Sequence, residues 1–148
     1  MSHTYSNLLV HIIFGTQERR PTIAAEIRPD LFAYTGGIVR GLHGRALVVG
    51  GTNDHVHVMM RLPQHASVAG VVRVVKTNSS RWIHEKWPER ASFSWQTGYG
   101  AFSVSESAAA AVIKYISEQP KHHRHWSFQE EFVAFLKKNG IEYDERYV

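Results

Sequence analysis

The sequence predicts an α+β fold of the ferredoxin-like class, with an antiparallel sheet in the order β-α-β-β-α-β and added C-terminal helices. Four stretches rich in β-branched and aromatic residues are interrupted by two long stretches with apolar residues at helical spacing. A short glycine-containing turn joins the second and third strands, and an alanine-rich helical stretch follows the fourth. We therefore expect a single domain over residues 1–148, with a core at about 5–125 and a C-terminal helix and tail at 126–148.

The first strand and the first helix are indicated by composition. Residues 5–14, YSNLLVHIIF, are apolar and β-branched, and the glycine, charges and proline of the following segment, GTQERRP, end this strand. Apolar residues then recur at helical spacing over residues 22–42, which predicts a helix. Pro29 and the pair Gly36 and Gly37 weaken it, because proline and glycine disfavour a helix interior.

A hairpin and a second helix follow. Residues 45–51, RALVVGG, and residues 54–63, DHVHVMMRLP, are apolar runs separated by a turn-forming glycine and asparagine segment. Pro63 closes the second of these strands. Ser67 is a suitable N-cap for the next helix, in which valines and other large apolar residues form a stripe and which Pro88 ends.

The last predicted strand precedes two helices. Residues 93–105, FSWQTGYGAFSVS, supply aromatic and small residues for a fourth strand. Ser103 and Glu106 form a candidate capping box for an alanine-rich helix that stops before Pro120. A final amphipathic helix is expected over residues 127–140. In the ferredoxin-like topology the first and third strands are central, so the third strand is expected in mid-sheet.

Composition limits the function classes. The chain contains no cysteine, which excludes disulfides, thiolate metal sites and cysteine nucleophiles and favours a cytoplasmic location. No stretch approaches the roughly twenty apolar residues that span a bilayer, and no basic segment precedes the N-terminal apolar run, so neither a membrane segment nor a signal peptide is expected. A net charge of +4 and a pI of about 9.5 favour a polyanionic partner, most often nucleic acid.

Two histidines stand one residue apart in the predicted third strand, within the segment NDHVHVMMRLP. Because strand side chains alternate between two faces, His55 and His57 share one face while Asp54, Val56 and Val58 share the other. The valines are expected to pack against the two helices of the fold. The histidines therefore face away from those helices, unless a later element covers that surface, and Asp54 falls on the wrong side for a metal ligand.

A histidine pair is not by itself a functional site. Two surface histidines often alternate on a half-exposed strand, and a bound metal ion needs a third ligand. The alanine-rich helix offers a candidate, because Tyr115 and Gln119 are four residues apart and lie on one helical face. The alternative is that Tyr115 continues the apolar stripe of Val112 and Ile116 into the core.

The combination of these motifs resembles a known family. HVH on the third strand, followed by a helix that carries Tyr-x-x-x-Gln, is similar to the single-tyrosine HUH transposases of bacterial insertion sequences, the IS200-like transposases, where U denotes a hydrophobic residue. The segments HIIFGTQERRP, NDHVHVMM, FSWQTGYGAFSVS and YISEQPKHH are also typical of that family. The resemblance runs from about residue 5 to residue 125 in the expected order.

The resemblance implies cleavage and rejoining of single-stranded DNA by transesterification, with hairpins at the element ends. Tyr115 would form a 5′-phosphotyrosine that keeps the phosphodiester energy, so no nucleotide cofactor is expected. His55, His57 and Gln119 would bind a divalent metal ion, Mg²⁺ or Mn²⁺ in this family, and as neutral ligands would leave its charge undiminished. Family members act as homodimers, and in some states the tyrosine helix of one subunit completes the site of the other.

Tyr115 is preferred among the six tyrosines because it alone pairs with a glutamine one turn along a well-formed helix. Tyr99, in the glycine-flanked fourth strand, is the second choice. Tyr5, Tyr143 and Tyr147 lie at a strand start or in a polar tail, where little would hold them in place. A phenol of pKa about 10 is a poor nucleophile at neutral pH, and the sequence indicates no base for it.

Basic residues provide candidate contacts to DNA. His122, His123 and His125 follow Pro120 in the polar segment KHHRHW and are expected either to contact DNA phosphates or to lie exposed in solvent. Six further candidates come from the first two helices and the hairpin: Arg40, Arg45, Arg61, Lys76, Arg81 and Lys86. Any single one of these is more often a solvated surface charge.

Two other functions are compatible with these patterns. TGYGAFSV approaches the aromatic signature of RNA-binding modules on the same fold. It nevertheless begins with Thr97 where a basic residue is expected, Ala101 shifts the aromatic register, and the segment lies on the fourth strand rather than the third. A domesticated relative that binds and nicks chromosomal repeats would carry the same site residues, so these residues do not separate it from the transposase of a mobile element.

Overall fold

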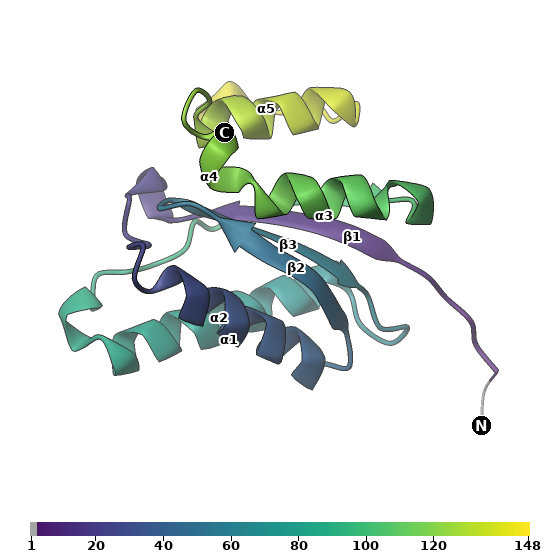
Figure 1. Cartoon of the computed structure of the whole chain (residues 1–148), viewed down its shortest axis with the longest axis horizontal. Helices are drawn as coiled ribbons and strands as arrows, with labels where there is room; N and C mark the ends of the chain where they lie inside the picture. The colour runs from purple at the N-terminus through teal and green to yellow at the C-terminus, as the bar shows by residue number, and fades with distance from the viewer. Residues whose placement is uncertain (1–2) are drawn as a thin grey trace.

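A computed structural model of the chain describes residues 3–148. Four strands form one antiparallel sheet in the order β2-β3-β1-β4 (Figure 1). They are β1 (Leu9–Gly15), β2 (Arg45–Gly51), β3 (His55–Arg61) and β4 (Gly100–Val104). The predicted ferredoxin-like class is confirmed, and β3, which carries the two histidines, lies in mid-sheet between β1 and β2.

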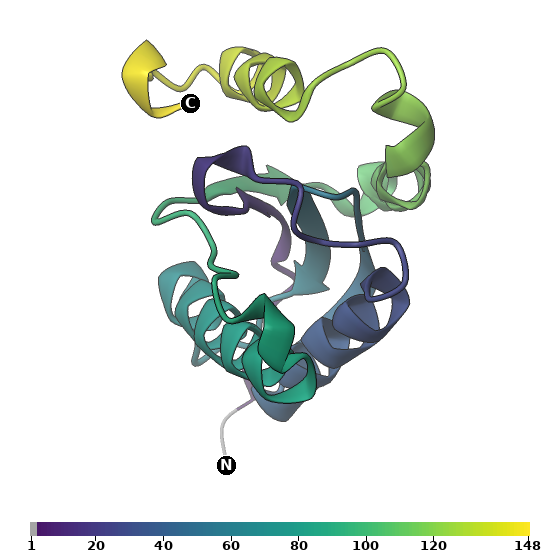
Figure 2. The same ribbon diagram turned by 90° about the vertical axis from the view of Figure 1, so that its left-hand side faces the viewer.

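Helices cover both faces of the sheet (Figures 1 and 2). On one face lie α1 (Arg28–Gly41) and α2 (Val68–Lys86), the two crossover helices of the predicted fold. On the other lie α3 (Ala109–Ser117), the short α4 (Gln119–His122) and α5 (Phe128–Lys138). Short 3-10 helices occur at Gln17–Arg19, Pro88–Arg90, Glu106–Ala108 and Glu145–Tyr147. Within residues 3–148, every helix is too short or too polar to cross a membrane.

The alternation of side chains along the strands produces an apolar core on each face of the sheet. Val56 and Val58 belong to the main core with α1 and α2, as predicted. On the opposite face Met59 packs with Ile116 of α3, and Ile13 packs with α5. The C-terminal helices thus cover the surface that the sequence left unassigned, and the histidines of β3 lie beneath them.

Two elements begin later than predicted. β1 starts at Leu9 rather than Tyr5, because Leu9 pairs with Arg61, which is the last residue of β3. Tyr5 is accordingly 90% exposed. α1 starts at Arg28, and Pro29 lies in its first turn, where a missing backbone amide removes no helical hydrogen bond.

The predicted helix caps agree only in part. Ser67 Oγ accepts a hydrogen bond from the Gly70 amide at 3.0 Å, which confirms Ser67 as the N-cap of α2. The capping box predicted at Ser103 and Glu106 is wrong, because Ser103 is a residue of β4. The Glu106 carboxylate instead accepts hydrogen bonds from Arg61 at 3.1 and 3.2 Å.

β4 is shorter than the predicted range of 93–105. Before Gly100, the segment forms an isolated bridge between Trp95 and Thr16, the residue that follows β1, and no regular strand. The Trp95 indole donates to Ser79 Oγ of α2 at 3.0 Å, and its ring packs against the main core. Side-chain packing under the sheet therefore takes this aromatic segment out of the strand.

Candidate active site

β3 places the histidine pair in the middle of the sheet. His55 and His57 lie on the same face, as the strand alternation predicts, and both are 0% exposed. The C-terminal helices α3, α4 and α5 lie over that face (Figure 1). The alternative of two surface histidines is therefore wrong.

Hydrogen bonds at Nδ1 orient both imidazole rings. His55 Nδ1 donates to Asp54 Oδ1 at 2.7 Å, and Thr52 Oγ1 lies 3.1 Å from the same nitrogen. His57 Nδ1 lies 2.7 Å from Nε2 of His11 on β1. With Nδ1 occupied, each ring presents Nε2 to the site, which is how metal-binding histidines are commonly held. Asp54 was not expected to bind a metal ion. In the structure its carboxylate instead holds the His55 ring in its orientation.

Tyr115 and Gln119 reach the histidine pair from two helices rather than one. The helix is interrupted between them, because Pro120 lies in the first turn of α4, which begins at Gln119. Gln119 is fully buried, and its Oε1 lies 2.8 Å from His55 Nε2. The Tyr115 ring lies edge-on to the His57 ring, with 6.1 Å between centroids. The structure therefore brings the phenol, the amide and the two imidazoles together within one chain.

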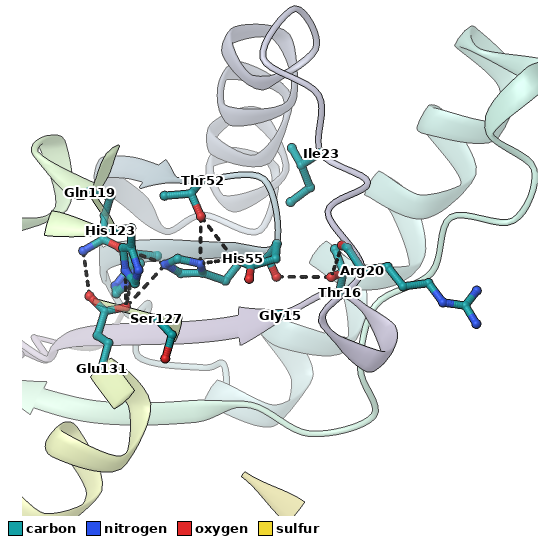
Figure 3. A network of polar contacts seen from close by, with 12 residues as sticks. Gly15, Thr16, Arg20, Ile23, Thr52, His55, Gln119, His123, Ser127 and Glu131 are labelled. Carbon is teal, nitrogen blue, oxygen red and sulfur yellow. Dashed lines mark hydrogen bonds and ion pairs between the residues drawn. The ribbon is translucent and has the colours of Figure 1, made fainter. Parts of the chain in front are cut away.

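Glu131 of α5, which was not among the residues predicted from the sequence, lies among these side chains, and Figure 3 shows its contacts with Gln119 and His123. Its Oε1 lies 3.0 Å from His57 Nε2 and 3.3 Å from His55 Nε2. Its Oε2 accepts hydrogen bonds from the Tyr115 hydroxyl and from Gln119 Nε2. One carboxylate thus contacts all four residues predicted for the site.

A signal for Glu131 is present in the sequence. α5 begins with a complete capping box, in which Ser127 Oγ accepts from the Glu130 amide at 3.1 Å. Glu131 follows Phe128 by three residues and precedes Phe135 by four, so it lies on the apolar face of the helix. A carboxylate on such a face is buried only when partners are available, which makes it a candidate site residue.

Burial and hydrogen bonding set the charges of the site. Burial acts to raise the pKa of Glu131, but hydrogen bonds from His123 and His55 outweigh it and hold that pKa well below its ordinary value. Burial acts to lower the pKa of His55, but hydrogen bonds to Asp54 and Glu131 outweigh it and raise the pKa to about 9. Burial, followed by the Glu131 carboxylate, raises the pKa of Tyr115 far above its ordinary value. In this arrangement His55 and Glu131 therefore form an ion pair, and the Tyr115 phenol keeps its proton.

The donor atoms fit a divalent metal ion. Two ligands that each lie about 2.1 Å from one ion are about 3.0–3.4 Å apart in octahedral or tetrahedral sites. The separations of Glu131 Oε1 from the two histidine Nε2 atoms, 3.0 and 3.3 Å, match this range. Ligand atoms of His55, His57 and Glu131 all lie within 4.8 Å of one another, and Gln119 adds a second oxygen donor. With Glu131 included, the set is anionic, whereas the sequence indicated neutral ligands only.

We expect Asp54→Ala to weaken Mn²⁺ binding about 10–100-fold, because the Asp54 carboxylate orients the His55 ring and raises its basicity. Calorimetric titration of the metal-free protein measures the change. Asp30→Ala is the matched control, since Asp30 lies on α1 and pairs with Lys86 at 3.2 Å. Equal affinities in Asp54→Ala and the unsubstituted protein would contradict the orienting role.

The histidines after Pro120 differ in their surroundings. His123 Nε2 donates to Glu131 Oε1 at 3.1 Å, and only 10% of its side chain is exposed, so the expectation of solvent exposure is wrong for His123. The half-buried His122 ring stacks on Tyr115 with 4.6 Å between centroids, and its Nε2 is buried without a hydrogen-bond partner among residues 3–148. His125 is exposed.

The candidate DNA-contacting cations differ in availability. Arg40, Arg45 and Arg81 are exposed. Arg61 and Lys86 form ion pairs of 3.1 and 3.2 Å, and Lys76 Nζ donates to two backbone carbonyls before β4. The latter three are therefore less available to DNA than the exposed arginines.

The other candidate nucleophiles lie elsewhere. Tyr99 is 39% exposed, and its ring is 5.9 Å from Lys76 Nζ. Tyr5 and Tyr147 are 90% and 77% exposed. Within the described part of the chain, Tyr115 is the tyrosine that contacts the histidine pair.

A ferredoxin-like sheet with a central histidine pair, approached by a tyrosine from a following helix, is the arrangement that the resemblance to transposases implied. The chain belongs to the family described as Transposase IS200 like, whose family profile matches residues 4–119. Transposases for insertion sequence element IS200 from Salmonella typhimurium and Salmonella typhi are each 26% identical to it over 124 residues, which cover 80% of this chain and 81% of theirs. The family resemblance inferred from the motifs is confirmed.

Two solved structures share the fold. A putative transposase from Deinococcus radiodurans superposes with a TM-score of 0.66 at 20% identity, covering 80% of this chain and 95% of its own. A REP-associated tyrosine transposase bound to a REP hairpin has a TM-score of 0.61 at 14% identity, covering 83% of this chain and 74% of its own. Helix α5 lies beyond the residues that the family profile matches.

Proposed function

We propose that this chain cleaves and rejoins single-stranded DNA by transesterification, with Tyr115 as the nucleophile and a divalent metal ion held by His55, His57 and Gln119. The observation that carries the proposal is the convergence of these four side chains on one point, in a member of the IS200-like transposase family. Neither motif alone supports it, because a histidine pair also fits a half-exposed strand and Tyr115 also fits a core position.

The proposed reaction exchanges one phosphoester for another. The Tyr115 oxygen attacks the phosphorus, the P–O3′ bond breaks, and the products are a 5′-phosphotyrosine and a free 3′-hydroxyl. The phenol loses one proton and the departing 3′ oxygen gains one, so the step releases no net proton and consumes no nucleotide. In the second step another 3′-hydroxyl attacks the phosphotyrosine, forms the new P–O3′ bond and restores the phenol.

The residues of the chain bind and orient the reacting groups. Asp54 and His11 hold the two imidazoles with Nε2 toward the site, and Gln119 presents its carbonyl oxygen from α4. Mg²⁺ or Mn²⁺ bound there supplies Lewis-acid stabilisation of the charge that develops on the phosphate. His122 Nε2, which has no hydrogen-bond partner within residues 3–148 and lies beside Tyr115, is suited to donate to a phosphate oxygen.

We also propose hairpin DNA as the substrate and a homodimer as the active form. A hairpin partner is supported by the structural neighbour that was solved bound to a REP hairpin. A dimer is supported by the family resemblance. The exposed Arg40, Arg45 and Arg81 are the cations best placed among the candidates to contact a DNA backbone.

The test of this function is covalent capture of DNA. Purified protein is incubated with single-stranded hairpin oligonucleotides, taken from DNA flanking the gene and labelled at the 3′ end, in Mn²⁺, Mg²⁺ or EDTA. We expect a denaturation-resistant protein–DNA adduct with either metal ion and none with EDTA. An RNA-binding module forms no adduct with any oligonucleotide, so binding without capture in both metal ions would overturn the proposal.

A further inference from the structure

The site is closed to a DNA strand in this structure. His55, His57, Gln119 and Glu131 are each 0% exposed. The Phe128 ring of α5 covers His55, with centroids 4.3 Å apart and an interplanar angle of 5°. Among the described residues, these groups leave no path for a phosphodiester to the two imidazoles, so at least one covering element has to move before DNA can reach them.

The Glu131 carboxylate uses the hydrogen-bonding groups that a scissile phosphate would need. Carboxylate and phosphate oxygens are recognised by the same donors and by the same cations. The carboxylate contacts five residues of the site: His55, His57, Tyr115, Gln119 and His123. One of these contacts is with the proposed nucleophilic oxygen itself. An anion therefore already lies where the phosphorus would have to be attacked.

We propose that α5 is a displaceable cover, and that Glu131 holds the place of the scissile phosphate until the DNA strand displaces it. This inference rests on the proposed function, since it states what competes with DNA for the same site. It makes the present arrangement a resting state and assigns the carboxylate a role that opposes cleavage.

The sheet is shaped to receive this cover. A Cβ built on Gly100 of β4 would lie 2.6 Å from Phe132 Cε2, and a Cβ built on Gly15 of β1 would lie 2.6 Å from Phe128 Cε2. Carbon atoms in van der Waals contact are about 3.5–4.0 Å apart. Any larger residue at either glycine would therefore push an α5 phenylalanine away from the sheet. The absence of a side chain at these two positions makes room for the phenylalanine rings.

The packing of α5 allows this helix to leave the sheet without unfolding the rest of the protein. Its buried side chains pack with Ile13 and Phe102 in a cluster separate from the core beneath α1 and α2. The segment between α4 and α5 contains the exposed Arg124 and His125. An element with its own small core and an exposed connection opens at a lower free-energy cost than the body of the domain.

Substitutions in the full-length protein test the cover. Phe132→Ala weakens the docking of α5 and touches no proposed site residue, and Glu131→Gln removes the anion while keeping its shape. For both we expect adduct formation with the 3′-labelled hairpin in saturating Mn²⁺ to become about 5-fold faster or more, the usual scale of a coupled equilibrium. Glu142→Gln, at an exposed position, is the matched control and is expected to leave the rate unchanged.

A second measurement does not depend on cleavage. Hydrogen exchange is followed in metal-free Tyr115→Phe protein with and without the hairpin oligonucleotide. Faster exchange of α5 amides on DNA binding, with unchanged exchange in α2, is the expected result. Adduct formation that is slower or unchanged in both Phe132→Ala and Glu131→Gln, or α5 exchange that DNA leaves unchanged, would overturn the cover.

These outcomes separate the cover from the proposed function. If the proposed function fails, the Glu131→Gln and Phe132→Ala proteins form no adduct either, and the exchange of α5 still decides whether DNA displaces it. If only the proposal of a cover is wrong, the unsubstituted protein still captures DNA, but the two substitutions make capture slower or leave its rate unchanged.

Discussion

Tyr115→Phe is expected to abolish the covalent protein–DNA adduct, with a loss of about 10⁴-fold or more, while binding of the hairpin oligonucleotide is retained. Phenylalanine has no oxygen with which to form the phosphoester. The aromatic ring keeps its stack with His122 and its edge contact with Phe135, and the contact that is lost is the hydrogen bond from the hydroxyl to Glu131. Denaturing gels of 3′-labelled substrate measure the adduct, and fluorescence anisotropy measures the binding.

Tyr99→Phe is the matched control for this experiment. Tyr99 lies on the exposed side of the segment before β4 and was the second candidate from the sequence. We expect its adduct to form at the rate of the unsubstituted protein. If Tyr115→Phe still formed the adduct and Tyr99→Phe did not, Tyr99 would be the nucleophile and the proposed active site would be wrong.

Gly50→Ala is expected to lower adduct formation about 100-fold and to reduce the free energy of unfolding by about 1–3 kcal/mol. A Cβ on Gly50 of β2 would lie 2.5 Å from the backbone oxygen of Ile116 and 3.0 Å from its Cγ2. Helix α3 then has to move away from the sheet, and Tyr115, the preceding residue, moves with it. Denaturant unfolding and the capture assay measure the two effects.

Gly36→Ala provides the comparison for Gly50→Ala. A Cβ on Gly36 in α1 would meet only Ala46 Cβ, at an ordinary 3.9 Å. Alanine in a helix interior is more favourable than glycine by about 0.5–1 kcal/mol, so this substitution is expected to stabilise the protein slightly and to leave capture unchanged. Full activity and stability in Gly50→Ala would show that the close approach of α3 to β2 does not position Tyr115.

The position of Glu131 changes how the charge of the site is understood. The ligands expected from the sequence are neutral, which leaves the full charge of a metal ion available to a phosphate. With Glu131 present, the site instead holds an internal anion that neutralises His55 and accepts a hydrogen bond from Tyr115. The displacement of α5 and the preparation of the nucleophile are therefore coupled through one side chain.

Much of the fold was predictable because its signals are local. Strand alternation placed His55 and His57 on one face and Val56 and Val58 on the other, and the structure agrees. Ser67 begins α2 as its side-chain chemistry indicates. Element ends were less predictable. β1 begins at Leu9 because a partner strand ends there, which is a property of pairing between distant segments and not of the residues before Leu9.

By itself, the sequence determined the strand order, the shared face of the histidines and the family. The shared face depends on strand periodicity, whereas the strand order and the family depend on local patterns that follow one another in a characteristic order along the chain. Only the tertiary structure decided that the site is buried and that Glu131 lies at its centre. Glu131 is 74 residues from His57 and 12 from Gln119. No helical or strand period relates positions so far apart. Their contact depends on how α5 folds back over the sheet, and therefore on the packing of Phe128 and Phe132 against it.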